Sequence, residues 1–197
     1  MSAEETSTAE RILDAAEAVL RRHGAEKTNV VDIARALEMS HGNIYRHFPS
    51  KQALINAVAM RWLLAVVTPL EVIAEDGARP ASERLEAWFE TLRGIKIKKV
   101  FDDPELFRVH HQIVMKVPEV VTEHVGTLLR QLELIIADGV RSGEFSSGLD
   151  PAIAARAFLH ASSPFHHPAL LMQNRPSDAE AHAVFALLLA GLKAGAA

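Results

Sequence analysis

The stretch TNVVDIARALEMSHGNIYRHFPSK, residues 28–51, reads as two short helices joined by a tight turn. Apolar residues recur at helical spacing over residues 30–37, and Ser40 can cap a second helix over residues 41–48. Pro49 ends that helix, because proline disfavours helical geometry in the residue before it. The second helix carries small, polar and basic side chains that suit the DNA major groove. The stretch therefore predicts a helix-turn-helix.

In this motif, the N-terminal end of the second helix faces the base edges. Gly42 allows the backbone to approach DNA closely, and Asn43 can read an adenine edge with two hydrogen bonds. Tyr45 and His47 can hydrogen-bond phosphates, and Lys51 offers a mobile cation to the DNA backbone. The predicted DNA-binding residues are Thr28, Asn29, Ser40, His41, Gly42, Asn43, Tyr45, Arg46, His47 and Lys51.

Some of these positions also have structural interpretations. Thr28 and Asn29 begin the first helix of the motif, where free N–H groups and the helix dipole attract phosphate, and either can cap that helix. Arg46 either contacts a phosphate or only solvates its face of the second helix. Asp32 fits a cap or a surface partner better than a functional acid, and Ile44 belongs to the core.

The bulk composition limits the classes of protein that fit. The chain has 197 residues, of which 49% are hydrophobic and 23% charged, as in an ordinary globular protein. The absence of cysteine excludes disulfides, thiolate metal sites and thiol redox sensing. Residues 1–11 are polar and acidic, unlike a secretory signal, and no uninterrupted apolar run reaches membrane-spanning length. We therefore expect a cytoplasmic protein without a membrane partner.

The charge distribution supports a local rather than a general attraction to DNA. The net charge of the chain is −4, which argues against a protein that coats DNA. Residues 27–51, however, include four basic side chains and only two acidic ones, with two histidines in addition. A basic module on an acidic body fits selective DNA binding.

Helix start and stop signals recur along the whole chain, and no segment alternates as a strand would, which predicts an all-α fold. Thr8 can cap the first helix and Gly24 can end it. The remaining helices are expected at 30–37, 41–48, 51–72 with a disturbance at Pro69, 83–100, 104–116, 118–141, 151–162 and 178–193, which makes nine. We expect a DNA-binding domain at residues 1–54 and a helical domain at residues 55–197.

The helix-turn-helix and the helices around it resemble the N-terminal domain of the tetracycline-repressor (TetR) family of bacterial transcriptional regulators. The resemblance covers residues 9–55, and the matching residues are Gly24, Thr28, Asp32, Ile33, Ala34, Ser40, Gly42, Ile44, Tyr45, His47, Phe48, Ser50, Lys51 and Leu54. It implies a homodimer, a double-stranded operator with two half-sites, and a C-terminal domain that binds a small molecule and controls DNA release.

One position departs from the family pattern. The family usually has a small residue, often glycine, where this chain has Glu38. A left-handed backbone there would strain a glutamate, and its carboxylate would bring negative charge near DNA.

Residues 55–197 are rich in large apolar side chains, which either fill a helical core or line an apolar cavity with a few polar groups. The family resemblance favours the cavity, and therefore a small, largely apolar effector. The candidate effector-binding residues are Trp62, Phe89, Phe107, His111, Met115 and Phe158.

The helical body also holds seven histidines, but no HxxxH or HExxH spacing is present. Structural or surface histidines therefore fit better than a metal site, and a histidine bonded to an effector is the intermediate alternative. We expect no metal ligands, no cofactor and no catalytic residues, because a Gly-rich phosphate loop and a nucleophile–base pattern are also missing.

The last two helices, near residues 152–161 and 179–192, are rich in alanine and leucine, and the final one carries apolar residues around more than one face. Such helices cover something on two sides, which favours a homodimer interface over a helix buried in a monomer. The function that fits best is a repressor released by a small ligand. The alternatives are a ligand-independent dimeric regulator and a helical ligand carrier or enzyme, and activation instead of repression stays open.

Overall fold

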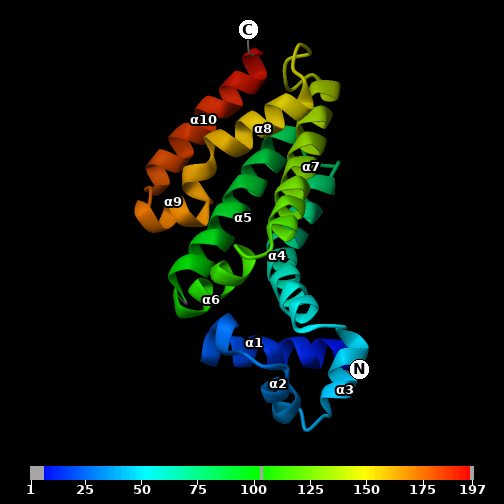
Figure 1. Ribbon diagram of the computed structural model, residues 1–197. Coiled ribbons are helices and arrows are strands. Elements are labelled where there is room, and N and C mark those ends of the chain that lie inside the picture. Colours follow the sequence, from blue (N-terminus) through cyan, green and yellow to red (C-terminus); the bar gives the residue numbers. More distant parts are fainter. Residues whose placement is uncertain (1–6, 103, 196–197) are drawn as a thin grey trace, which may run out of the picture. The chain divides into compact units, whose positions relative to one another are not determined.

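The computed structural model describes residues 7–102 and 104–195, and these form ten α-helices and one 3-10 turn without any strand (Figure 1). The all-α prediction is confirmed. The helices are α1 (Thr8–Lys27), α2 (Val30–Ala36), α3 (His41–His47), α4 (Lys51–Glu75), α5 (Ala81–Phe101), α6 (Pro104–Val114), α7 (Pro118–Ser142), α8 (Pro151–Ala161), η1 (Ser163–Phe165), α9 (Pro168–Gln173) and α10 (Asp178–Ala194).

The ends of the first helix differ from the expectation. Ser7, not Thr8, is the N-cap of α1, since its hydroxyl accepts from Glu10 N at 3.2 Å while the Glu10 carboxylate accepts from Ser7 N. Gly24 has a φ of 75°, so regular helical geometry stops there as expected, although a further turn continues to Lys27.

Two further expectations need correction. Helix α4 continues through Pro69 to Glu75 instead of ending near residue 72. Helix α9 was not expected, because its six residues make too few turns for apolar periodicity to be visible, although Pro168 occupies a favoured first position. The expected starts of α8 and α10 have local causes: Asp150 caps α8, and Ser177 and Glu180 form a capping box at α10.

Helix α4 is, among the described residues, the one helix long and apolar enough to cross a membrane by length and composition. Arg61 interrupts its apolar run, and 39% of the apolar window is buried inside the protein. A single helix of this kind is a weak indication of a membrane span, because buried core helices have the same length and composition.

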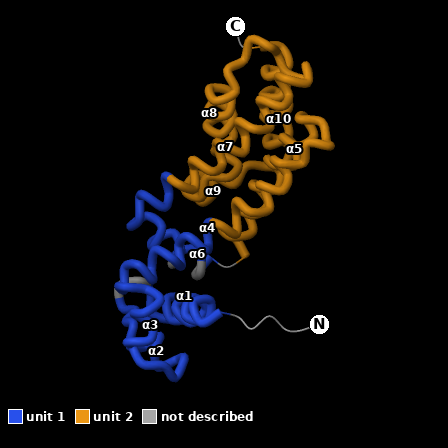
Figure 2. The backbone as a smooth tube through the Cα atoms, turned by 90° about the vertical axis from the view of Figure 1, so that its right-hand side faces the viewer, with its two compact units in different colours: residues 1–63, 104–122 blue, residues 64–103, 123–197 orange. Residues whose placement is uncertain are grey.

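The chain divides into two compact units, shown in blue and orange in Figure 2. Unit 1 comprises residues 1–63 and 104–122, and unit 2 comprises residues 64–103 and 123–197. This division differs from the expected boundary after residue 54, because α6 packs against α1 and places Ile113 and Val114 in the core of unit 1. The centre of that core is apolar and closed to solvent, with Ile12, Leu20, Ile33, Ile44 and Leu54 almost fully buried.

Unit 2 has a larger core, built from α5, α7, α8, α10 and the second part of α4. Trp88 is fully buried, and its indole N–H donates to Gln131 Oε1 at 3.0 Å. Gln131 in turn donates to the Val67 carbonyl at 3.0 Å, so these buried polar groups are satisfied. Rings from α5, α8, η1 and α10 meet in an aromatic cluster of Phe89, Phe158, Phe165 and Phe185.

Candidate functional site

Helices α2 and α3 form the expected helix-turn-helix, and each begins with a side-chain cap. Asn29 Oδ1 accepts from Val31 N at 3.3 Å, and Ser40 Oγ accepts from Asn43 N at 3.3 Å. In the turn between the helices, Glu38 has a φ of 54°. It is the only non-glycine residue with a positive φ among the described residues. The backbone at Glu38 is therefore left-handed, which is the condition under which a glutamate is strained at this departure from the family pattern.

Helix α3 has one buried anchor and an exposed polar face. Ile44 is fully buried in the core of unit 1 and fixes the rotation of the helix, while Tyr45 is 46% exposed. The other exposed candidates on this helix are His41, Gly42, Arg46 and His47. Among the described residues, neither Arg46 nor Lys51 has an ion-pair partner, whereas Arg35 lies 3.3 Å from Asp32. The face of α3 is therefore polar, basic and open to a partner.

Thr28 does not lie on this face. It is 3% exposed, and its hydroxyl donates to the Gly24 carbonyl at 2.7 Å, so the side chain closes the end of α1. The Thr28 backbone N–H is directed to the same carbonyl at 3.2 Å, which leaves no donor for a phosphate. Asn43 and Lys51 are half-buried, and Asn43 Nδ2 lies 3.6 Å from the Met39 sulfur.

The six candidate effector-binding residues do not form one group. Trp62, Phe107 and His111 belong to unit 1, where the Phe107 ring lies 6.2 Å from Trp62 and 5.5 Å from His111. Phe89 and Phe158 belong to the aromatic cluster of unit 2, with ring centroids 6.3 Å apart. Met115 is 64% exposed and therefore lines no interior wall. The sequence did not show that these candidates belong to two different units. The reason is that α6 follows α5 of unit 2 along the chain but packs within unit 1.

A polar network that the sequence did not reveal joins α1, α4 and α6 within unit 1. Arg61 donates to Asp14 Oδ1 at 2.6 Å and to Glu17 Oε2 at 2.7 Å. The buried His110 places its Nε2 3.4 Å from Glu17 Oε1. The nearby His110 imidazole, followed by Arg61, lowers the pKa of Glu17 to about 2 against the opposing effect of burial.

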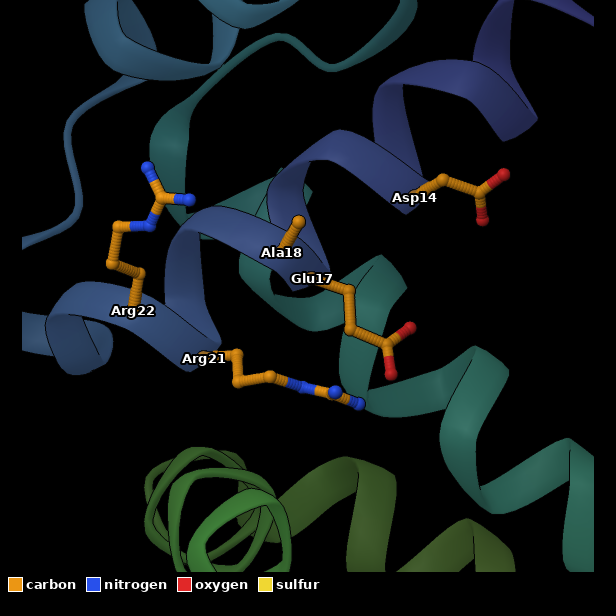
Figure 3. Close-up of a pocket in the computed structure, with 5 residues that line it drawn as sticks. All are labelled: Asp14, Glu17, Ala18, Arg21 and Arg22. Carbon is orange, nitrogen blue, oxygen red and sulfur yellow. The ribbon is translucent and has the colours of Figure 1, made fainter.

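An open hollow of about 550 Å³ lies beside this network. Its lining residues from α1, Asp14, Glu17, Ala18, Arg21 and Arg22, are drawn in Figure 3. In this view, Glu17 and Arg21 extend to the same side of α1, and Arg22 extends away from them. The two carboxylates are already paired with Arg61, so the hollow is a charge-balanced surface and does not suit a largely apolar effector.

Unit 2 contains a second polar group that the sequence did not bring together. Lys96 on α5 is 7% exposed, and its Nζ lies 3.3 Å from His124 Nε2 on α7. His166, which follows η1, is 6% exposed and lies 3.2 Å from the Ser162 hydroxyl through its Nε2. Within the described chain, no three histidine or acidic side chains are arranged to hold a metal ion.

Helices α8 and α10 expose an apolar groove of about 420 Å³. Ile153 on α8 is 62% exposed and Leu187 on α10 is 73% exposed, and both line the groove with Phe158, Leu188 and Leu192. These side chains form a contiguous exposed apolar surface on two neighbouring helices, which marks a candidate interaction surface.

Two parts of the chain match known protein families. Residues 12–58 match the bacterial regulatory proteins of the tetR family, and residues 81–185, more than half of the chain, match the tetracyclin repressor-like C-terminal domain. This chain belongs to the TetR family. The resemblance drawn from residues 9–55 is thereby confirmed, and the TetR-family chain is a DNA-binding transcriptional regulator.

One sequence relative and two solved structures show which known regulators this TetR-family chain is similar to. The fatty acid metabolism regulator protein of Bacillus subtilis (strain 168) is 24% identical over 148 residues, 73% of this chain and 74% of that protein. SmeT, the repressor of the Stenotrophomonas maltophilia multidrug efflux pump SmeDEF, has a TM-score of 0.70 and 24% identity, covering 94% of this chain and 90% of SmeT. FadR from Bacillus subtilis in complex with stearoyl-CoA has a TM-score of 0.56 and 24% identity, and the match covers 92% of this chain and 97% of the FadR chain.

Proposed function

We propose that this regulator is a cytoplasmic repressor whose operator binding is relieved by a small, largely apolar ligand bound in unit 2. The observation that carries the proposal is the exposed polar face of α3, held by the buried Ile44, in a chain with a tetracyclin repressor-like C-terminal domain. The likeness to SmeT, a repressor, and to FadR in complex with stearoyl-CoA supports repression and an effector with a long apolar part. The effector acts by binding better to the conformation that does not fit DNA.

The proposed DNA contacts follow from exposure and capping. They are Asn29, Ser40, His41, Gly42, Asn43, Tyr45, Arg46, His47 and Lys51, and Thr28 is left out because its donors are used inside the protein. For the effector we retain Phe89 and Phe158, which are aromatic residues of unit 2, and leave out the four candidates of unit 1.

A gel-shift titration with the DNA upstream of its own gene tests operator binding. Lys51→Ala should weaken binding about tenfold, and it should reduce the slope of log affinity against log salt concentration by about 1 per lost phosphate contact. The matched control is Lys98→Ala, which removes an exposed lysine of unit 2 and should leave both quantities unchanged. No shift of the wild type at low salt in the presence of competitor DNA would overturn the proposal.

We also propose that the regulator is a homodimer through the groove of α8 and α10. An operator with two half-sites requires two readers, and a twofold interface needs a self-complementary apolar face such as the one around Ile153 and Leu187. Leu187→Glu should therefore produce monomers in analytical ultracentrifugation and weaken operator binding. Val72→Glu is the control, because Val72 is 70% exposed in unit 2 but does not line the groove. A dimer that survives Leu187→Glu contradicts this interface.

A further inference from the structure

Four polar residues from separate segments of unit 2 form two pairs close to its aromatic cluster. Lys96 Nζ lies 3.3 Å from His124 Nε2, and Ser162 Oγ lies 3.2 Å from His166 Nε2. The charge of Lys96 acts on both imidazoles, because after burial it lowers the pKa of His124 and of His166. We call these four residues the Lys96 site. Three of them are less than a tenth exposed, and His124, which is half-buried, provides the more accessible side.

The Lys96 site has a buried cation without a counter-ion. The other buried cations of unit 2 are paired: Arg84 donates to Asp138 at 2.7 Å, and Arg93 donates to Asp178 at 3.0 Å. Among the described residues, no carboxylate lies within ion-pair distance of Lys96. Burial, followed by the charge of Lys99, lowers the pKa of Lys96 to about 8, which leaves most of its charge present at neutral pH. Such an isolated charge is costly unless a partner anion arrives.

The two imidazoles are suited to help bind an anion. Burial is the main cause that lowers the pKa of both His124 and His166 to about 3, so both rings are neutral at pH 7 and each has one N–H to donate. The Nδ1 atom of His124 is buried and has no hydrogen-bond partner among the described residues. One ammonium group and at least one unused imidazole nitrogen therefore lie within a few ångströms of each other.

The neighbouring side chains are apolar and aromatic. Phe89 lies seven residues before Lys96 on α5 and Phe158 lies four residues before Ser162, so each pair shares a helix face. Phe165 directly precedes His166, and its ring lies 6.0 Å from that of Phe89. The basic group and the aromatic cluster thus lie along shared helix faces, which matches a ligand with a charged head and an apolar body.

We propose that the Lys96 site binds the anionic head of an amphiphilic effector, a carboxylate or a phosphate carried on an apolar chain, with Lys96 as its counter-ion and His124 as a second donor. This inference rests on the proposed function, because it names the chemical class of the effector of unit 2. The head group neutralises the isolated lysine, and the apolar chain contacts the aromatic cluster.

Isothermal titration calorimetry with three twelve-carbon probes tests the site: laurate carries a carboxylate, dodecyl phosphate carries a phosphate, and dodecanol is uncharged. Lys96→Met should weaken binding of laurate, of dodecyl phosphate or of both by about 10- to 100-fold, because a charge-assisted contact is lost. The matched control, Lys98→Met, removes an exposed lysine from the same helix and should bind as the wild type does. Dodecanol should bind weakly and equally to all three proteins.

Thermal unfolding separates this outcome from a folding defect. Without ligand, Lys96→Met should be at least as stable as the wild type, because it removes an unpaired buried charge. His124→Leu offers a second variant that keeps the lysine, and it should weaken binding of the same anionic probe by about 5- to 10-fold. The preferred probe identifies the head group as carboxylate or phosphate.

The proposal is overturned if neither anionic probe binds the wild type, if Lys96→Met binds them as well as the wild type does, or if dodecanol binds as tightly as laurate and dodecyl phosphate. The operator gel shift without ligand is independent of these results. DNA binding without anion binding would leave the proposed regulator intact and remove the Lys96 site. Anion binding without any DNA shift would overturn the proposed operator binding and leave the Lys96 site as a binding site.

Discussion

The helix-turn-helix of unit 1 and the helical body of unit 2 differ in whether their basic side chains are exposed to solvent or buried. On α3 and at the start of α4, Arg46 and Lys51 are exposed or half-exposed on a continuous local motif. In unit 2, Arg84, Arg93 and Lys96 are buried, and one of the three lacks a carboxylate among the described residues. An outward cation suits a large polyanion such as DNA, whereas an inward, unpaired cation suits a small anion that enters the protein.

The largest effect that would test this contrast is expected from Gly42→Glu. Gly42 is exposed at the N-terminal end of α3, and a side chain there would meet only Ser40 Oγ, at 3.9 Å. A carboxylate near the first turn of a helix is favourable for folding, but on this face it would repel DNA. We expect operator affinity to fall by about 100-fold or more, with a melting temperature equal to or above that of the wild type.

Gly94→Glu is the matched control in unit 2. Gly94 is an exposed helical glycine on α5 with open space around it, so the same substitution adds the same charge to the other region. Gel-shift titration should show little change in operator affinity. Equal loss of affinity in both variants would show that net charge, and not the face of α3, controls DNA binding.

The next largest effect is expected from Gly139→Ala, which tests packing in unit 2. A Cβ at Gly139 on α7 would overlap the ring of Phe145, which is 2% exposed. Overpacking of this kind costs about 1–3 kcal/mol of unfolding free energy. Urea denaturation should show this loss, while Gly94→Ala should be neutral or stabilise by up to about 1 kcal/mol because alanine favours helix. An unchanged midpoint for Gly139→Ala would mean that the Phe145 ring can move aside.

The two regions also differ in how far the sequence predicts them. Local signals were sufficient for the helix-turn-helix, because Ser40 caps α3 and Pro49 follows its end. The sequence also marked Glu38 as a departure from the family pattern, and this residue has a left-handed backbone. The α8 start at Pro151 was equally visible, because a capping residue and a proline act within one turn. The sequence also predicted that both cores consist of apolar side chains at helical spacing.

Contacts between distant segments were not predictable in the same way. The packing of α6 on α1 makes Phe107 part of unit 1, while Phe158 belongs to unit 2, and no local pattern shows this. Lys96 and His124 are 28 residues apart, and Arg61 and Asp14 are 47 residues apart, so their pairing depends on tertiary structure. The sequence signal that could have pointed to Lys96 is a lysine inside an apolar helical stripe, at the spacing of Phe89, Leu92 and Lys96 on α5.

A moderate, pH-dependent effect is expected from Glu17→Gln in the polar network of unit 1. The pKa of Glu17 is lowered to about 2 in the folded protein from an ordinary 4.5, so the unfolded chain binds the proton more readily. The carboxylate therefore stabilises the fold fully above about pH 5, and this contribution is lost as the pH falls toward 2. With allowance for the partial exposure of Glu17, we expect Glu17→Gln to cost about 1–2 kcal/mol at pH 7.

Denaturant unfolding at several pH values measures this difference. The gap between wild type and Glu17→Gln should narrow steadily from pH 5 to pH 3. A suitable control is Glu86→Gln, an exposed glutamate of α5, whose effect on stability should be small at every pH. A gap for Glu17→Gln that stays constant with pH would show that the hydrogen bonds of the side chain, and not its ionisation, stabilise unit 1.

The smallest effect is expected at Glu38, where backbone strain and charge can be separated. Glu38→Gly relieves the left-handed conformation but gives the unfolded chain more freedom, so the net gain in stability should be only about 0–1 kcal/mol. Glu38→Gln keeps the strain and removes the charge, so it should leave the stability unchanged. Both variants remove a carboxylate beside the DNA-reading face, and each should tighten operator binding by about two- to fivefold at low salt. If only Glu38→Gly tightened binding, the shape of the turn, rather than its charge, would control how α3 meets DNA.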